Sequence, residues 1–303
     1  MPATRSCIST DRHSNMIGSR QTYHYSDRIL INYETLGHGP TPLVFLHGFA
    51  AALVTWHDIA PLFPEDRYTL YLLDLKGFGL SSKPRDARYS LDDQADIVVS
   101  FLKSQGNANA VLIGHSLGGT IALLAWFKAR DFGSPDLISR LILISSAAYP
   151  QRLPRLMRIV RTPLVGPLML HLVPPRTIVE YTLTRVFYNH AAITEERVER
   201  YIHCYNKRGI GYSFTMSVRQ LMPGGKPLPL PDYGAVSVPV LIIWGENDRI
   251  IRLNRGERLA SALPAARLAV VEECGHNPHE EKPDKTCEII RGFLETGEES
   301  RGG

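Results

Sequence analysis

The residue best suited to chemistry is Ser116, which stands in the pentapeptide Gly114-His115-Ser116-Leu117-Gly118. The buried-strand pattern 109–114 precedes it, and the helical pattern 117–130 follows it. Glycines on both sides allow a sharp strand-to-helix turn, on which the serine takes a positive φ and exposes its hydroxyl. We therefore predict that Ser116 is a nucleophile; the alternative is a serine that only caps the helix.

A serine hydroxyl needs a base to accept its proton, and an acid to hold that base in one tautomer. Asp248 follows the apolar segment 238–244, and His276 follows the apolar segment 267–271. We predict that His276 is the general base and that Asp248 orients it. Glu246 is the competing acid and His279 the competing base, although His279 precedes two glutamates and suits a helix start.

Acyl transfer also requires N–H donors for the negative charge that develops on the substrate oxygen. The N–H of Leu117, directly after the nucleophile, is one candidate. The N–H of Phe49, in the loop His47-Gly48-Phe49-Ala50, is the other, and the His47 side chain is expected to be a buried structural hydrogen-bonding group. His115 and Trp56 are candidates for contact with the substrate.

The elements that must position these residues follow from the apolar patterns of the chain. Seven segments have the character of strands: 28–36, 42–47, 68–75, 109–114, 140–146, 238–244 and 267–271. Helical patterns lie between them at 91–104, 117–130 and 253–262. Alternating strands and helices predict an α/β fold with a mostly parallel sheet and helices on both faces.

One stretch interrupts this alternation. Residues 149–235 are rich in proline and contain several helical patterns but no convincing buried strand. We predict a helical insertion there, within a core formed by residues 21–148 and 236–298. Residues 1–20 are polar, with no apolar core typical of a signal peptide, and are expected to be a disordered tail.

Together the motifs resemble the cap-containing α/β-hydrolase superfamily over about residues 25–296. The resemblance rests on the HGF loop (47–49), DLKGFGLSSKP (74–84), GHSLGG (114–119), WGEND (244–248) and GHNPHEEKP (275–283). It implies an eight-stranded sheet with a helical cap inserted after the sixth strand, and structural roles for Asp74, Gly77 and Gly79. Many relatives have proline at the position of Ala50, so the loop that carries Phe49 departs from the family pattern.

The resemblance also narrows the reaction. Dehalogenases and epoxide hydrolases of this fold use aspartate as nucleophile, and Ser116 excludes their alkyl-enzyme chemistry. Hydrolysis of carboxylic esters of small to medium hydrophobic substrates is expected, as in the esterase and lipase-like branch, without a cofactor or metal. Two alternatives stay open: a carbon–carbon bond hydrolase of ring-cleavage dienoates, and a slow-turnover receptor-like protein. Relatives of the first kind usually place tryptophan after the catalytic histidine, where this chain has Asn277.

Composition places limits on the class of protein. With 44% hydrophobic and 21% charged residues, the chain is typical of a globular protein. Its apolar runs are too short to span a bilayer. The four cysteines, Cys7, Cys204, Cys274 and Cys287, are scattered without CxxC spacing, which favours reduced thiols and a cytoplasmic protein over a zinc site.

The positive charge is concentrated in the insertion. Residues 150–235 hold 12 Lys/Arg against 5 Asp/Glu, a local charge of +7. Arg152, Arg155, Arg158 and Arg161 recur every three residues beside an apolar side formed by Leu153, Leu156, Met157 and Val160. The pattern predicts a helix that packs over the site with its arginines in water. It also allows a weak contact with an anionic membrane surface, whereas no contact with nucleic acid is expected.

Overall fold

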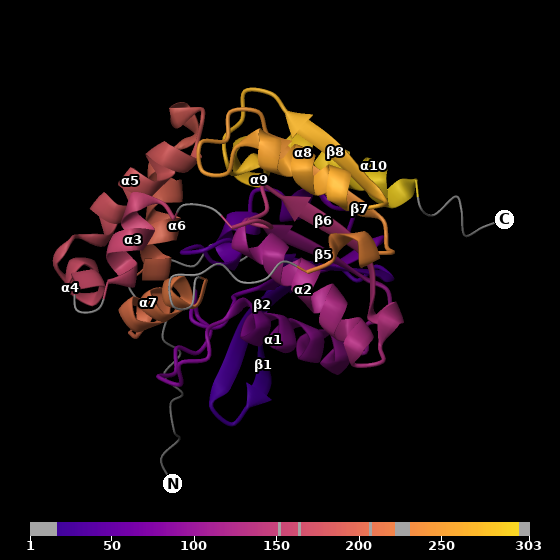
Figure 1. The fold of residues 1–303 in the computed structure, drawn as a ribbon, viewed down its shortest axis with the longest axis horizontal. Coiled ribbons are helices and arrows are strands. Elements are labelled where there is room, and N and C mark those ends of the chain that lie inside the picture. The colour runs from indigo at the N-terminus through magenta and orange to yellow at the C-terminus, as the bar shows by residue number, and fades with distance from the viewer. Residues whose placement is uncertain (1–16, 151–152, 163–164, 206–207, 222–230, 297–303) are drawn as a thin grey trace, which may run out of the picture.

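One eight-stranded sheet organises the molecule (Figure 1). The computed structural model describes residues 17–150, 153–162, 165–205, 208–221 and 231–296. The strand order is β1-β2-β4-β3-β5-β6-β7-β8. The strands are β1 (Ser19–Ser26), β2 (Ile29–Leu36), β3 (Thr41–Leu46), β4 (Tyr68–Leu73), β5 (Ala110–His115), β6 (Ile138–Ile144), β7 (Val240–Gly245) and β8 (Ala266–Val271). β2 pairs antiparallel with β1 and β4, and the other neighbours are parallel, which confirms the predicted α/β fold.

Helices cover both faces of the sheet. On one face, α1 (Leu91–Ser104), α2 (Leu117–Asp131) and α8 (Leu253–Ala262) contribute to a large apolar cluster. On the other, α10 (Pro283–Glu295) and the short 3-10 helix η1 (Leu53–Trp56) contribute to a second cluster. The central strands β3 and β5 are buried along almost their whole length, because side chains on both of their faces meet a cluster.

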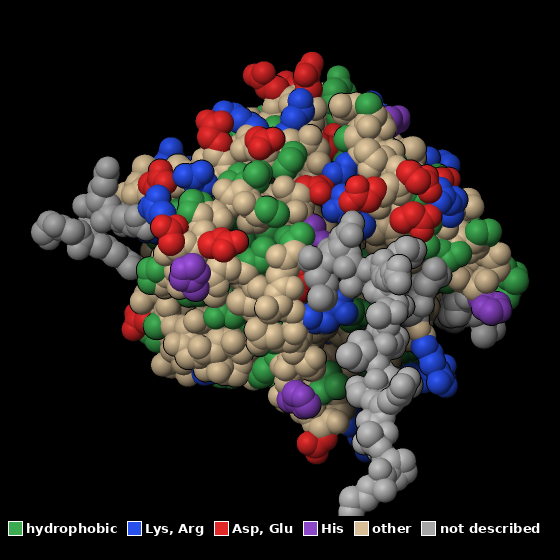
Figure 2. Space-filling model, turned by 180° about the vertical axis from the view of Figure 1, so that it is seen from behind, with side chains coloured by type: hydrophobic (Ala, Val, Ile, Leu, Met, Phe, Trp, Pro, Cys, Tyr) green, Lys and Arg blue, Asp and Glu red, His purple; other side chains and the backbone are tan. Residues whose placement is uncertain are grey.

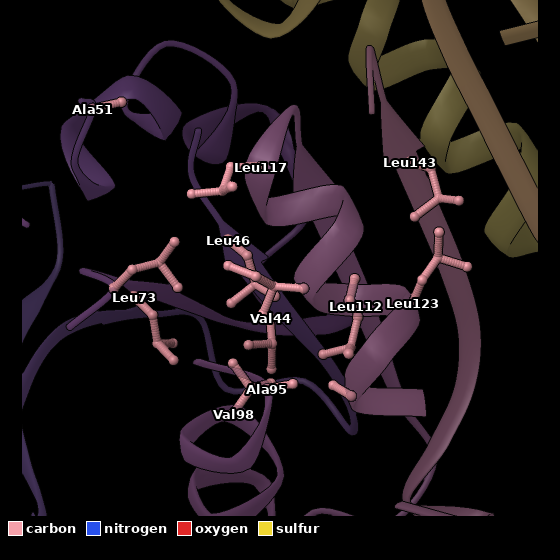
Figure 3. Packing of buried hydrophobic residues seen from close by; sticks show 14 of the residues in the cluster. Val44, Leu46, Ala51, Leu73, Ala95, Val98, Leu112, Leu117, Leu123 and Leu143 are labelled. Carbon is pink, nitrogen blue, oxygen red and sulfur yellow. The ribbon is translucent and has the colours of Figure 1, made fainter. Parts of the chain in front are cut away.

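The helix that follows Ser116 is fixed against the middle of the sheet. Figure 3 shows Leu117 and Leu123 of α2 beside Val44 and Leu46 of β3 and Leu112 of β5. All five side chains are at most 5% exposed. The start of α2 is therefore held in place by packing along the helix.

The first strand corrects the predicted tail boundary. Ser19 and Arg20 belong to β1, so the folded chain begins earlier than residue 21. β1 is an edge strand with mainly exposed polar side chains, so its sequence has no apolar run that would predict a strand. Tyr23 is a side chain of β1 that packs inward: its ring lies edge-on against Phe101 of α1, with ring centroids 5.5 Å apart. The rest of the predicted tail, residues 1–16, lies outside the described residues.

In the described residues between β6 and β7, five α-helices form a separate layer at the left of Figure 1. We call them the inserted helices. They are α3 (Arg155–Arg161), α4 (Val165–Leu172), α5 (Pro175–Val186), α6 (Glu195–Tyr205) and α7 (Ile210–Leu221). A final short helix, α9 (Pro278–Glu281), precedes α10. Arg152, the first arginine of the predicted helix, lies outside the described residues.

No helix in the described part of the chain is long and apolar enough to cross a membrane.

Candidate active site

Ser116 lies on a strained turn between β5 and α2. Its φ is 52° and its ψ is −111°, a conformation that side chains other than glycine rarely adopt. Its backbone is held on both sides: the Ser116 N–H donates to Ile144 O at 2.9 Å, and the Ser116 carbonyl accepts from Ala147 N at 3.0 Å. The turn thus points the side chain away from the ladder of the sheet, and Ser116 lines a cavity.

Glycines make this turn possible through close packing. A side chain on Gly114 would overlap the backbone of Gly118, and one on Gly118 would overlap the carbonyl oxygen of Leu46 at the end of β3. A side chain on Gly119 would overlap the hydroxyl of Ser146. The predicted spacing of glycines therefore has a steric cause, because strand, turn and helix approach one another too closely for any Cβ.

Asp248 and His276 form a buried pair. His276 Nδ1 lies 2.7 Å from Asp248 Oδ2, and both side chains are at most 5% exposed. The other carboxylate oxygen of Asp248 accepts from the N–H groups of Ile250 and Ile251 at 2.8 and 2.9 Å. These bonds fix the carboxylate, which in turn orients the imidazole and leaves Nε2 as the nitrogen that does not face the acid.

The competing acid and base lie apart from this pair. Glu246 is exposed, and its carboxylate accepts from Glu273 N at 3.4 Å. His279 is fully buried between Trp56 and His115, with ring centroids at 4.3 and 4.6 Å. Neither nitrogen of His279 has a hydrogen-bond partner among the described residues. Burial lowers its pKa to about 3, so this ring is neutral and lacks the acid that a catalytic histidine needs.

The loop after β3 lies against the turn. A Cβ on Gly48 would lie 2.9 Å from His115 Nδ1 and 3.4 Å from Ser116 Cβ, so only glycine lets this loop approach so closely. Phe49 and Leu117 both line the same cavity as Ser116. Within the described chain, the N–H groups of Phe49 and Leu117 have no hydrogen-bond acceptor. Two free amides beside a serine can receive a developing negative charge.

His47 and Asp74 hold the framework of this loop. The His47 ring bonds to Gly48 O through Nδ1 at 2.8 Å and accepts from Leu75 N through Nε2 at 3.0 Å. Asp74 accepts from Asn32 Nδ2 and from the N–H of Leu53, both at 2.8 Å. Both side chains are buried and bonded within the core, in keeping with a structural role.

The cavity has a volume of about 260 Å³ and a mainly apolar wall. The core contributes Ser116 and Leu117, and the inserted segment contributes Leu153, Met157 and Leu221. The remaining lining residues are Phe49, Leu91, Asp92, Thr120, Leu123, Leu124, Ala147, Ala148, Tyr149, Pro150, Pro154, Pro231, Tyr233 and Ile250. Among the described lining residues, Asp92 is the one charged side chain, so most of the described wall offers apolar contact.

His115 and Trp56 take positions that differ from the expected contact with substrate. Neither belongs to the described lining of the cavity. His115 Nε2 bonds to the backbone carbonyl of His276 at 2.9 Å, and Trp56 packs edge-on against Phe45 in the second apolar cluster. His115 is a neighbour of the candidate base, since the rings of His115 and His276 lie 4.8 Å apart.

Sequence reasoning missed how the His276 loop is tied to the inserted helices. His276 N–H donates to Val186 O at 2.7 Å, at the end of α5. The Glu281 carboxylate accepts from Gly275 N at 2.8 Å, from Tyr188 N at 2.8 Å and from Asn189 N at 3.1 Å. The sequence signal for this join is the pair of glutamates after His279, but in the sequence this pair predicts only a helix start.

A second tie links α6 with the core through charged groups. Arg197 bonds to Asp58 and to the carbonyl of Glu280, and Arg200 Nη1 donates to Asp58 Oδ1 at 2.9 Å. Tyr201 donates to Glu280 Oε2 at 2.7 Å. Burial raises the pKa of Glu280 to about 7, although Arg197 opposes that rise. Burial also favours neutral Asp58, but the hydrogen bonds from Arg197 and the charge of Arg200 outweigh it and lower its pKa.

Comparison with known proteins agrees with this architecture. A model of the alpha/beta hydrolase family matches residues 43–289. The chain is 30% identical over 274 residues to the uncharacterized hydrolase YugF of Bacillus subtilis (strain 168), covering 88% of this chain and 95% of that protein. It is 25% identical to a 2-hydroxy-6-oxononadienedioate/2-hydroxy-6-oxononatrienedioate hydrolase of Burkholderia vietnamiensis (strain G4 / LMG 22486), covering 94% and 96%.

Among solved structures, a membrane phospholipase A described as a bacterial virulence factor is similar, with a TM-score of 0.74 and 28% identity. The similarity covers 92% of this chain and 86% of that one. The match of the family model spans β3 to α10 and includes Ser116, Asp248 and His276. The chain therefore belongs to the alpha/beta hydrolase family and is a hydrolase by that membership.

Proposed function

We propose that this chain is a serine hydrolase that cleaves carboxylic esters of small to medium hydrophobic substrates through an acyl-enzyme on Ser116. The observation that carries the proposal is the wall of one apolar cavity. Ser116 stands there on a positive-φ turn between the free amides of Phe49 and Leu117. The bonded pair His276–Asp248 supplies the base and its orienting acid.

The proposed reaction assigns a role to each of these groups. His276 Nε2 accepts the proton of the Ser116 hydroxyl as Oγ attacks the ester carbonyl. The Phe49 and Leu117 amides donate to the oxyanion, and each such donor contributes roughly 2.7–4 kcal/mol in comparable sites. Collapse expels the alcohol, which takes the proton from His276. Water then attacks the acyl-enzyme and gives a proton to His276. Cleavage of the acyl–Oγ bond releases the acid, and His276 returns the proton to Ser116 Oγ.

The apolar wall favours esters over the carbon–carbon bond cleavage that the Burkholderia relative's name describes. That substrate is a dioate and carries two carboxylates. Carboxylates in protein sites are usually bound by cationic or amide donors, yet the described lining of this cavity contains no Lys, Arg or His and does contain Asp92. The similarity to a phospholipase, an enzyme that cleaves ester bonds, also supports the ester reaction.

The inserted helices act in this proposal as a cap. Their residues Leu153, Met157 and Leu221 close the cavity over Ser116, exclude water and present apolar surface to the acyl group. The cavity volume of about 260 Å³ is near the lower end of ligand pockets, which favours small to medium acyl groups.

A panel of p-nitrophenyl esters of increasing acyl length tests the proposal. The wild type is expected to hydrolyse them with kcat/KM rising from acetate before falling when the chain outgrows the cavity. Ser116→Ala should lose the activity, and a fluorophosphonate probe should add one mass adduct at Ser116 in the wild type alone. An adduct on another residue would refute the nucleophile. Faster turnover of a ring-cleavage dienoate than of every ester would favour the carbon–carbon reaction. If no substrate were turned over at all, the receptor-like alternative would be favoured.

A further inference from the structure

The outer face of α4 exposes a stripe of large apolar side chains. Val165, Leu168 and Leu172 are 51%, 55% and 67% exposed. Their spacing of three and four residues places them on one side of the helix. The side away from this stripe packs inward, because Gly166 lies against the carbonyl of Val160 and Leu170 packs on the apolar core. Hydrophobic side chains accordingly gather at the right-hand edge of Figure 2, on the side where α4 lies.

The neighbouring helix α3 adds positive charge to this stripe. Arg155, Arg158 and Ile159 share one exposed face of α3, which packs against α4. The carboxylates of the described chain form no ion pair with Arg155, Arg158 or Arg161. Arg176, Arg197 and Arg200 of α5 and α6, in contrast, all have carboxylate partners. The sequence contains no Asp or Glu between Asp136 and Glu180, so nothing acidic is adjacent along the chain.

We propose that this face, which we call the docking surface (Arg155, Arg158, Ile159, Val165, Leu168 and Leu172), binds anionic phospholipid membranes. Apolar side chains in a row gain free energy by entering the boundary between headgroups and acyl chains. Arginines beside them gain charge-assisted hydrogen bonds to lipid phosphates and are attracted by the negative charge of an anionic surface. The surface carries both features on adjacent helices, and an anionic lipid layer satisfies both.

A second copy of the chain fits this surface less well. Symmetric dimers join the same patch on both subunits. Such a contact would bring the arginines of two α3 helices together without any acidic side chain of α3 or α4 to neutralise them. The charge therefore favours an anionic partner.

Docking would place lipid beside the candidate active site. Met157, on the same short helix as Arg155 and Arg158, lines the cavity with Ser116. α3 thus has one face toward water and the other toward the cavity. A hydrophobic substrate that leaves the membrane would have only this layer to pass.

Vesicle sedimentation tests the proposal with the intact chain. The vesicles are phosphatidylcholine alone and phosphatidylcholine with increasing phosphatidylglycerol, at low and at physiological salt. The wild type is expected to bind more as the anionic fraction rises and less as salt rises. Arg155→Glu/Arg158→Glu and, separately, Leu168→Ser/Leu172→Ser should each reduce binding at least tenfold.

Matched variants serve as controls. Arg28→Glu/Arg267→Glu reverses two exposed arginines away from α3 and α4, and Phe132→Ser/Val270→Ser removes two exposed apolar side chains elsewhere. Both should bind as the wild type does. Hydrolysis of a soluble p-nitrophenyl ester should be unchanged in all four variants, which separates a failure of docking from a failure of the proposed reaction.

Three outcomes would overturn the docking surface. The first is no binding to anionic vesicles at low salt. The second is equal loss in the control variants. The third is a dimer in solution that dissociates in Leu168→Ser/Leu172→Ser while vesicles are ignored, which would assign the stripe to a second copy of the chain.

Discussion

At the scale of single residues, the chemistry of the candidate site depends on how Asp248 holds His276. The carboxylate accepts from two backbone amides and from His276 Nδ1, so it is held in a fixed orientation. An amide in its place can keep the shape but can donate to the imidazole and select the wrong tautomer. The proposed role of Asp248 is therefore to keep the proton of His276 on Nδ1, so that Nε2 is free to act as the base.

We expect Asp248→Asn to lower kcat by about 10⁴-fold with little change in the unfolding temperature, and His276→Ala to lower kcat at least 10³-fold. Steady-state kinetics with the preferred p-nitrophenyl ester measures both. The matched variant is Glu246→Gln, which alters an exposed carboxylate in the same loop and should leave kcat within twofold. A larger loss in Glu246→Gln than in Asp248→Asn would reassign the acid.

The buried His279 should make the stability of the protein depend on pH. His279 has a pKa of about 3 in the folded protein against 6.5 ordinarily, so the unfolded chain binds more protons between these values. Its contribution to the free energy of unfolding is complete above pH 6.5 and is lost as the pH falls toward 3, by at most about 1.4 kcal/mol per pH unit. His279→Leu should flatten the decline between pH 6 and pH 4.

Urea denaturation at several pH values measures that slope. Glu280 contributes with the opposite sign, because its pKa is raised from 4.5 to about 7 and its contribution falls as the pH rises through that window. Glu280 is present in both the wild type and His279→Leu, so its contribution cancels when the pH dependence of their free energies of unfolding is compared. An unchanged slope would show that His279 is not held neutral by burial.

At the scale of elements, the approach of β3, β5 and α2 sets the position of the nucleophile and its oxyanion donors. Gly118 touches the backbone of Leu46, the last residue of β3 before the loop that carries Phe49. A methyl group there must push the helix and the loop apart. Displacement by about 1 Å can cost about 10²-fold in rate.

Gly118→Ala is accordingly expected to lower kcat about 10²-fold while the protein stays folded, as checked by ester kinetics and far-UV circular dichroism. Gly292→Ala in α10 is the control, since a Cβ there meets nothing within 4 Å. It should keep full activity and gain up to about 1 kcal/mol of stability. Equal kinetics for the two variants would contradict the packing argument.

The sequence predicts those helices and strands that have an apolar face or that are apolar on both faces. Seven strands lie within two residues of the predicted segments, because buried parallel strands such as β5 consist of uninterrupted apolar residues. β1 escaped because it is a polar edge strand. The glycines around Ser116 and the pairing of Asp248 with His276 were also predictable, since chain order and turn chemistry encode them.

Other features depend on contacts between distant segments and could not be read from the sequence. Trp56 looked available for substrate but is buried against His279, more than two hundred residues away in the chain. The cavity wall combines α2, the segment before α3 and the end of α7, so no local pattern describes it. The arginine spacing from Arg152 to Arg161 predicts a helix, observed as α3 over Arg155–Arg161, but not which arginines form ion pairs with carboxylates.

At the scale of the whole molecule, ion pairs between α6 and the core fix the inserted helices over the cavity. Arg197 is buried and bonds to Asp58 and Glu280, whereas Arg176 is exposed and pairs with glutamates within the insertion. Removing one partner from a buried pair leaves a charge without compensation, which costs far more than the loss of a surface pair.

We expect Arg197→Met to lower the free energy of unfolding by about 1–3 kcal/mol, after allowance for the partial exposure of Asp58, and to raise KM for long-chain esters more than for acetate. Arg176→Met is the matched variant and should change stability by less than about 1 kcal/mol. Chemical denaturation and the acyl-length panel provide the measurements. Equal effects of the two variants would show that the buried pair does not hold the insertion.

Hydrogen bonds fix the loop that carries His276 to the chain at the end of α5. Four backbone amides, those of Gly275, His276, Tyr188 and Asn189, are used in this join. If the layer of inserted helices moved away at that end, it would pull His276 away from Asp248. An opening of this layer that admits substrate is therefore expected at its far end, near α3, where it would leave His276 beside Asp248.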